Sequence, residues 1–76
     1  MLITVNGRLK FFNTITAFAK HGHGEYTVER NTLKFTVFGG HAAGGGRRDW
    51  FVQQDGWTGP INCTSLVDAL NLIDTM

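Results

Sequence analysis

The sequence predicts an α+β domain of two layers, in which one or two helices pack on one face of an antiparallel sheet of three to five strands, in the order β-α-β-β-β-α. Three observations lead to this fold class. Apolar and polar residues alternate in several short stretches, Asn-Gly and Asp-Gly pairs mark tight turns, and apolar residues recur at helical spacing near the C-terminus. The 76 residues are 42% hydrophobic and 17% charged, so we expect a single folded domain over 1–76.

The chain begins with a predicted strand at 2–5, where LITV is apolar and rich in β-branched residues. Asn6-Gly7 follows it, and this pair favours a tight turn because both residues tolerate positive φ angles. A hairpin that returns through 8–11 is therefore one interpretation of this region. The stretch from residue 8 to about residue 12 stays open between strand and helix.

A short helix is predicted at 13–21. Its basis is a set of apolar residues at helical spacing: Phe11, Phe12, Ile15, Phe18 and Ala19. Asn13 is a suitable N-cap, because its side chain can accept a hydrogen bond from a backbone N–H of the first turn. Gly22 is a suitable stop, since glycine readily adopts the left-handed conformation that ends many helices.

The clearest element is a hairpin in the middle of the chain, where EYTVE and TLKFTVF are joined by Arg30-Asn31. The register that aligns the apolar residues has these cross-strand pairs: Glu29 with Thr32, Val28 with Leu33, and Tyr26 with Phe35. In this register the apolar side chains share one face of the hairpin. The opposite face is polar and carries Glu25, Thr27, Glu29, Lys34 and Thr36.

Two more elements follow the glycine-rich stretch. Trp50–Gln54 is a predicted strand, and Asp55-Gly56 turns the chain into a short arm at 57–58 that Gly59-Pro60 ends. A C-terminal helix then begins at Thr64 or Ser65 as N-cap, with Asp68 in the first turn as an acidic form of the capping box. Its apolar stripe comprises Leu66, Ala69, Leu70 and Ile73.

The most unusual stretch is FGGHAAGGGRRDW, residues 38–50, in which five glycines and two alanines accompany Arg47 and Arg48. A phosphate-binding P-loop would require Gly-Lys followed by Ser or Thr and then a helix, and neither is present. We expect 39–46 to be a flexible loop that lets the two arginines pair with carboxylates or phosphates of a partner, since guanidinium binds both in bidentate geometry. The alternative is a loop that only connects two strands.

Aromatic residues flank this stretch. In the predicted register Phe38 lies on the solvent face, and Phe51 joins it if Trp50 and Val52 point inward. Aromatic and arginine side chains are enriched at protein interfaces. The predicted partner-binding residues are Phe38, His41, Arg47, Arg48, Phe51 and Trp57. The alternative is that other elements cover the aromatic rings, which would then complete the core.

No catalytic set is recognisable, and we expect no enzymatic activity, no cofactor and no metal. His21, His23 and His41 do not supply the four ligands of a zinc site. Cys63, the single cysteine, has no base or orienting residue at a recognisable spacing and is expected to be a buried packing residue. Glu25 and Glu29 would lie ~13 Å apart along a strand, too far for a glycosidase pair.

The predicted function is a small non-enzymatic protein-binding module, an inhibitor or adaptor of a larger protein or ribonucleoprotein complex. The chain starts with Met1 and is short, like many accessory proteins of phages and mobile elements, among them anti-CRISPR and host-takeover proteins. Its net charge of +1, its single cysteine and the lack of a signal peptide or an apolar span predict a cytoplasmic protein that does not contact membranes. Leu72 beside the helix stripe and an exposed sheet edge predict a weak homodimer.

Nucleic-acid binding is the alternative function. From residue 13 the predicted order of helix, three strands and helix resembles the double-stranded-RNA-binding domain in layout, over about four-fifths of the chain. That resemblance implies RNA binding, but the family has a lysine-rich start of its last helix, where this chain has no basic residue at 62–66. Single strands could instead bind to Arg47, Arg48 and the nearby aromatic rings.

Overall fold

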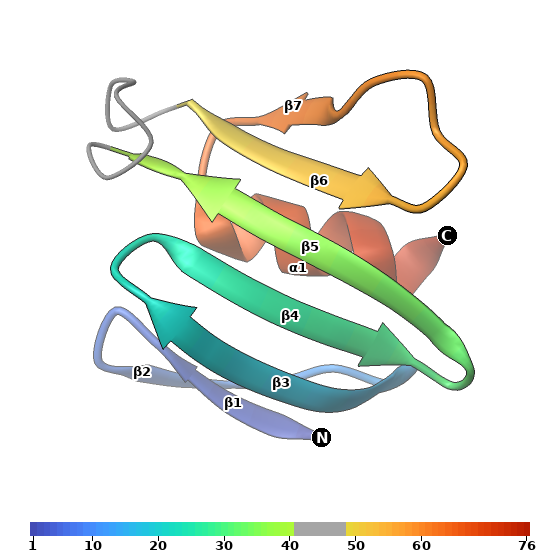
Figure 1. Ribbon diagram of the computed structural model, residues 1–76. Coiled ribbons are helices and arrows are strands. Elements are labelled where there is room, and N and C mark those ends of the chain that lie inside the picture. Colours follow the sequence, from blue (N-terminus) through green and yellow to red (C-terminus); the bar gives the residue numbers. More distant parts are fainter. Residues whose placement is uncertain (41–48) are drawn as a thin grey trace.

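The computed structural model describes residues 1–40 and 49–76, which form strands and one helix (Figure 1). The strands are β1 (Leu2–Val5), β2 (Arg8–Phe11), β3 (Ile15–Gly22), β4 (Glu25–Arg30), β5 (Leu33–Gly39), β6 (Trp50–Gln54) and β7 (Ile61–Cys63), and the helix is α1 (Leu66–Thr75). β3 to β7 form a five-stranded antiparallel sheet in chain order, and β1 and β2 form a separate two-stranded sheet. The predicted α+β class is confirmed, with a main sheet of five strands and one C-terminal helix.

The N-terminal region is a hairpin, as one of the two interpretations proposed. Asn6 and Gly7 have positive φ angles of 51° and 77°, as a two-residue hairpin turn between right-twisted strands requires. Leu2 pairs with Phe11 and Val5 with Arg8. Residues 8–11 are therefore a strand.

The predicted helix at 13–21 is wrong, because this segment forms β3. The register between β3 and β4 shifts between Ile15 and Ala17, so that Thr16 is an extra residue on β3. This bulge lets Ile15 and Phe18 point to the same side of the sheet although they are three positions apart, a spacing that also places two residues on one face of a helix. The β-branched residues Ile15 and Thr16 favour the strand, since branching at Cβ restricts the side chain in a helix. With β3 as a strand, the layout no longer resembles the double-stranded-RNA-binding domain.

β4 and β5 form the predicted hairpin, but the predicted register is wrong by two residues. Val28 pairs with Phe35, and Arg30 pairs with Leu33. The turn therefore lies at Asn31-Thr32, where Asn31 adopts a positive φ of 57° that asparagine tolerates well. A shift of two residues keeps every side chain on its predicted face, because side chains alternate with a period of two.

β6 matches the predicted strand at 50–54, but the predicted return arm at 57–58 is wrong. The Asp55-Gly56 turn is present, because the Trp57 backbone N–H donates to the Gln54 carbonyl at 3.1 Å. The Trp57 ring then packs edge-on against Phe35, with ring centroids 6.1 Å apart, so the chain leaves the sheet at this point. It returns as β7, which pairs Ile61 with Val52.

α1 begins as predicted at Ser65, whose side-chain oxygen accepts a hydrogen bond from the Asp68 backbone N–H at 3.1 Å. The Thr64 hydroxyl also donates to the Asp68 carboxylate. The predicted stripe is confirmed, since the buried residues of α1 are Leu66, Ala69, Leu70 and Ile73. Asp68 also suits this position electrostatically, because the N-terminal end of a helix favours negative charge.

The core lies on one face of the main sheet, which α1 and the β1–β2 hairpin cover; α1 is seen behind β5 in Figure 1. One cluster of buried side chains joins the hairpin, the sheet and the helix: Ile3, Val5, Phe12, Ile15, Val28, Phe35, Val37, Val52, Cys63, Leu66, Ala69, Leu70 and Ile73. We call this the inner face. The opposite, outer face of the sheet is the side turned toward the viewer in Figure 1.

A group of hydrogen bonds joins the end of α1 to the start of β3. The Asp74 carboxylate accepts from the backbone N–H groups of Asn13 at 3.1 Å and Thr14 at 2.6 Å, and from the Thr14 hydroxyl at 2.7 Å. The hydroxyl of Thr14 also lies 2.7 Å from the Asp74 carbonyl oxygen. These hydrogen bonds, that from the Thr14 side chain above all, hold the pKa of Asp74 below its ordinary value. They fix the helix against the sheet across 60 residues of sequence.

Replacing Phe35 by alanine should lower the free energy of unfolding by ~3–5 kcal/mol, because the side chain is 1% exposed and its loss leaves a cavity. Urea denaturation measures this change. Phe11→Ala is the matched control, since Phe11 is 65% exposed and its loss should change stability by less than ~0.5 kcal/mol. Equal losses in the two variants would contradict the inner-face assignment.

Replacing Asp74 by asparagine should lower the melting temperature near neutral pH by roughly 2–5 °C. The folded-state pKa of Asp74 is lowered, so its contribution to stability is present above the unfolded-state pKa and is lost as pH falls through the folded-state pKa. The difference between wild type and Asp74→Asn should therefore shrink in acid. Thermal denaturation as a function of pH tests this, with Glu25→Gln on the exposed end of β4 as control. If the difference in melting temperature between wild type and Asp74→Asn stays constant down to about pH 2, the ionised Asp74 carboxylate does not stabilise the fold.

Candidate functional site

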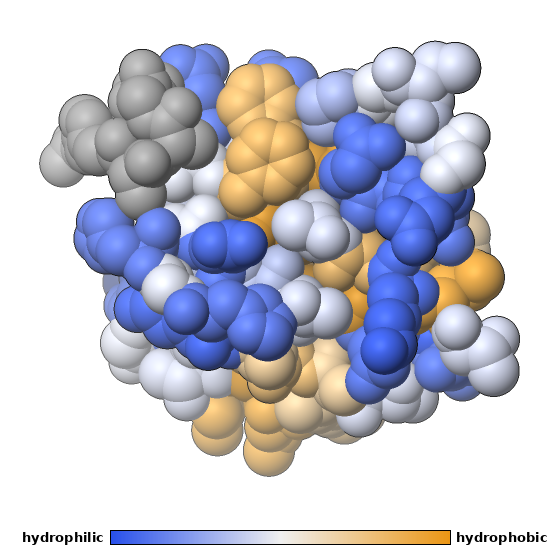
Figure 2. Space-filling model, in the orientation of Figure 1, coloured by the Kyte–Doolittle hydropathy of each residue, from blue (hydrophilic) through white to orange (hydrophobic). Residues whose placement is uncertain are grey.

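The outer face of the sheet is mostly polar, and its main apolar feature is a pair of phenylalanines. Phe38 on β5 and Phe51 on β6 are cross-strand partners, and their rings stack with centroids 5.4 Å apart and planes at 24°. Glu25 lies beside Phe38 on β4 and Asn62 beside Phe51 on β7, so one row across the sheet has an aromatic centre and polar ends. Figure 2 shows the apolar colour at the upper margin of this face. We call Phe38 and Phe51 the aromatic pair.

Three of the predicted partner-binding residues, His41, Arg47 and Arg48, lie outside the described residues. The residues on either side of that segment, Gly40 and Asp49, are joined by a hydrogen bond from the Gly40 N–H to the Asp49 carbonyl at 3.0 Å. They lie at the end of β5 and the beginning of β6, next to the aromatic pair in sequence and in the sheet.

Trp57 does not join the aromatic pair, so the prediction of a third aromatic beside it is wrong. The Trp57 ring contacts Phe35, a residue of the inner face, and is partly buried against the core. It also follows the opposite end of β6 from Phe51. The reason is that the turn at Asp55-Gly56 carries the chain around to the inner side, where an aromatic ring gains more burial.

The largest exposed apolar side chains lie elsewhere, on the β1–β2 hairpin. Leu2, Leu9 and Phe11 are 59%, 64% and 65% exposed. Leu2 pairs with Phe11 and Thr4 with Leu9, so these side chains share the face of the hairpin that is turned away from the core residues Ile3 and Val5. We call Leu2, Leu9 and Phe11 the hairpin patch; apolar colour is visible at the lower margin of Figure 2, over this region.

Sequence reasoning missed the hairpin patch because it left residues 8–12 undecided. The signal was present. In Arg8-Leu9-Lys10-Phe11 apolar and charged residues alternate, and with the Asn6-Gly7 turn this places Leu9 and Phe11 on the side opposite to the buried residues of β1.

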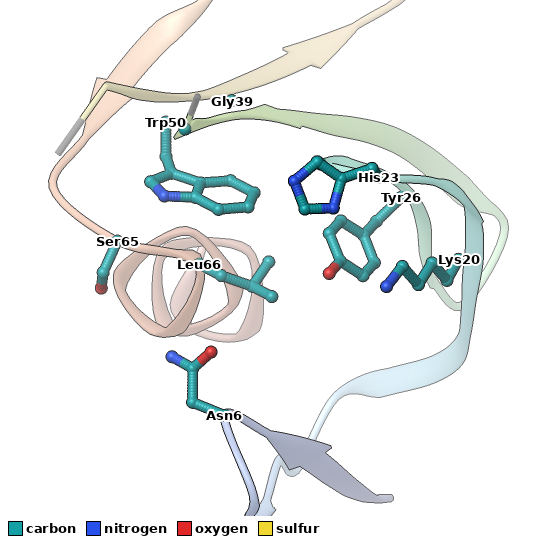
Figure 3. A pocket seen from close by; sticks show the side chains of 10 residues that line it. Asn6, Lys20, His23, Tyr26, Gly39, Trp50, Ser65 and Leu66 are labelled. Carbon is teal, nitrogen blue, oxygen red and sulfur yellow. The ribbon is translucent and has the colours of Figure 1, made fainter. Parts of the chain in front are cut away.

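A pocket of about 560 Å³ opens at one end of the inner face, between the Asn6 turn, the β3–β4 hairpin, the end of β5 and the start of α1. Figure 3 shows Trp50, Tyr26, His23 and Lys20 around its upper and right sides, with Leu66 and Asn6 facing them. The sequence did not predict that its polar residues form one site, because they come from segments far apart in the chain.

The titratable side chains of the described residues are dispersed. Within residues 1–40 and 49–76, no group of three or more His, Cys, Asp and Glu residues is close enough to hold a metal ion. His21 contacts the Thr27 hydroxyl on the outer face through Nε2. Cys63 is buried, and burial, with a smaller contribution from Asp68, raises the pKa of its thiol. A raised pKa disfavours the thiolate that a nucleophile or metal ligand requires.

Comparisons of this chain with protein-family models, with curated proteins and with solved structures give no match. Within residues 1–40 and 49–76, no helix has the length and apolar character needed to cross a membrane. Function must therefore be inferred from the surfaces themselves.

Cys63 should react slowly with iodoacetamide. Its burial and raised thiol pKa both reduce the accessible thiolate, so alkylation at about pH 8 should be at least ~10-fold slower than in urea-unfolded protein. Mass spectrometry of timed samples gives both rates. A folded-state rate equal to the unfolded one would mean that Cys63 is exposed and ionised.

Proposed function

We propose that this protein is a non-enzymatic protein-binding module, which acts as an inhibitor or adaptor by occupying a surface of a larger protein or ribonucleoprotein complex. The observation that carries the proposal is the hairpin patch. Three large apolar side chains, each more than half exposed, stand on one face of a two-stranded hairpin. Contiguous exposed apolar groups of this kind are typical of interaction surfaces.

The hairpin patch has the composition of an interface centre. The charged side chains of β2, Arg8 and Lys10, pair with Val5 and Ile3 and so belong to the other face of the hairpin. The hairpin patch therefore contains no charged side chain. Arg8 and Lys10 can form a polar rim around it. Interfaces commonly combine an uncharged centre with such a rim, and aromatic side chains often contribute most of the binding energy.

The aromatic pair supplies a second contact region for the same kind of partner. Phe38 and Phe51 form a preformed stack on a flat sheet face, so little side-chain entropy is lost when a partner covers them. We propose that Arg47 and Arg48, together with His41, recognise carboxylates of the same partner, as the sequence indicates. Trp57 is left out of this proposal because it contacts the core.

The experiment places a photo-crosslinking amino acid at position 11 in the hairpin patch or at position 38 in the aromatic pair. Position 34 is the control, because the Lys34 side chain is 74% exposed on the outer face, away from both regions. Each variant is irradiated in bacterial lysate with and without nuclease. We expect a defined protein adduct from position 11 or 38 but not from 34. Adducts that disappear with nuclease would favour the nucleic-acid alternative, and equal labelling from all three positions would overturn the proposal.

Charged substitutions then test the hairpin patch directly. Leu9→Asp combined with Phe11→Asp should weaken binding of the crosslinked partner by ~2 kcal/mol or more, about 30-fold, because charges would have to be buried at the interface. The melting temperature should stay within a few degrees, since both side chains are exposed. Lys34→Asp is the matched control, and unchanged affinity of the double variant would contradict this surface.

A further inference from the structure

We propose that the pocket at the start of α1 binds an aromatic ring that carries a carboxylate. This site lies on the inner side of the sheet, apart from the aromatic pair and the hairpin patch, and its argument does not depend on the protein-binding function. Its volume of about 560 Å³ is that of a small-molecule site, which typically measures ~300–1,000 Å³.

One wall of the pocket is aromatic and held in place by its neighbours. The rings of Tyr26 and Trp50 have centroids 6.1 Å apart and planes at 42°. Phe18 stacks on Tyr26 at 5.2 Å and 21°, which fixes the plane of the tyrosine ring. Leu66 projects from α1 toward the same space in Figure 3. A flat ring that enters the pocket therefore meets aromatic and aliphatic side chains on both sides.

Two glycines lie beside Trp50. Gly39 pairs with Trp50 across the strands, and a Cβ on Gly39 would collide with the backbone at Asp49 and Trp50. A Cβ on Gly40, which has a positive φ of 66°, would come within 3.4 Å of the Trp50 ring. Gly39 thus allows β5 and β6 to approach closely at Trp50. The Trp50 ring lies within van der Waals distance of the Gly40 position and packs against Tyr26 to form the aromatic wall.

The polar residues of the pocket favour an anion. Lys20 is the cross-strand partner of Tyr26, and Figure 3 shows its side chain running toward the tyrosine ring and the open space. His23 and Asn6 add hydrogen-bonding groups, and no Asp or Glu is among the described residues that line the pocket. The Asp68 carboxylate, in the first helical turn, accepts a hydrogen bond from the Thr64 hydroxyl and is not among the described residues that line the pocket. A carboxylate attached to the ring can thus pair with the Lys20 ammonium, and no carboxylate among the described lining residues opposes it.

The same chemistry occurs in free aromatic acids and in the C-terminal residue of a peptide that ends in phenylalanine. The test therefore uses both. Naphthaleneacetate is compared with its neutral analogue naphthaleneacetamide, and a short peptide ending in phenylalanine is compared with the same peptide amidated. For ligands of this size we expect a Kd on the order of 1 mM.

Nuclear magnetic resonance of uniformly nitrogen-labelled protein supplies an internal control, because the chain has two tryptophans and only Trp50 lines the pocket. Saturable shifts should appear for the Trp50 indole N–H and the Gly39 and Gly40 amides, while the Trp57 indole N–H stays in place. If these signals shift with naphthaleneacetate but not with the peptide, the site binds free aromatic acids. If they shift with the peptide as well, the site also binds the C-terminal residue of a peptide.

The charge requirement is tested with Lys20→Met, which keeps the aliphatic stem, against Lys34→Met on the outer face. Lys20→Met should weaken naphthaleneacetate at least about fivefold and leave naphthaleneacetamide unchanged, whereas Lys34→Met should change neither. Equal binding of acid and amide by the wild type, equal shifts of both tryptophans, or no saturable shift would overturn the proposal. None of these ligand titrations involves a protein partner. A negative result would therefore count against the pocket proposal and not against the protein-binding function tested by crosslinking.

Discussion

The contact between α1 and the inner face of the sheet is the interaction on which the rest of the structure depends. An antiparallel sheet of consecutive strands has two faces, and here the apolar side chains are concentrated on one of them. Leu70, Ala69 and Ile73 are fully buried against that face, and the Ser65 cap and the Asp74 hydrogen bonds fix the two ends of the helix. Without α1 the central strands would expose Val28, Phe35, Val37 and Val52 to water, and the free energy gained by burying these side chains would be lost.

One helix of this length cannot cover the whole inner face, and the β1–β2 hairpin covers the remainder with Ile3 and Val5. This second cover is only two strands wide and has apolar side chains on both faces, Ile3 and Val5 toward the core and the hairpin patch toward solvent. The hairpin patch is thus a consequence of using a hairpin instead of a second helix. The pocket has a related origin, since it lies where the hairpin turn at Asn6 and the start of α1 at Leu66 approach each other without closing over Trp50 and Tyr26.

Most strands and the helix could be predicted from the sequence, because period-two alternation, Asn-Gly and Asp-Gly turns and a capped apolar stripe are local signals. The error at β3 came from a bulge, which places Ile15 and Phe18 on one side of a strand at a spacing that a helix also produces. The register of the β4–β5 hairpin depended on which residue of Arg30-Asn31-Thr32 starts the turn, and that choice is decided by the backbone of Asn31. Of the predicted site, the placement of Phe38 and Phe51 on the outer face followed from strand alternation, whereas the placement of Trp57 depended on tertiary packing against Phe35. The pocket could not be predicted, since Lys20, Trp50 and Leu66 meet only after the whole chain has folded.

The hydrogen bonds between Thr14 and Asp74 also bear on the order in which the protein is synthesised and folds. Neighbouring strands of the sheet are neighbours in sequence, so the hairpins of β3, β4, β5 and β6 can form while the chain is still growing. The part of their apolar face that α1 covers nevertheless stays uncovered until α1 has been translated, because α1 follows these strands in the chain. At about 5–20 residues per second this leaves the nascent sheet exposed to chaperones and to other nascent chains for a matter of seconds. The Thr14–Asp74 hydrogen bonds join the last turn of α1 to the start of β3, and they can form only after translation of the helix.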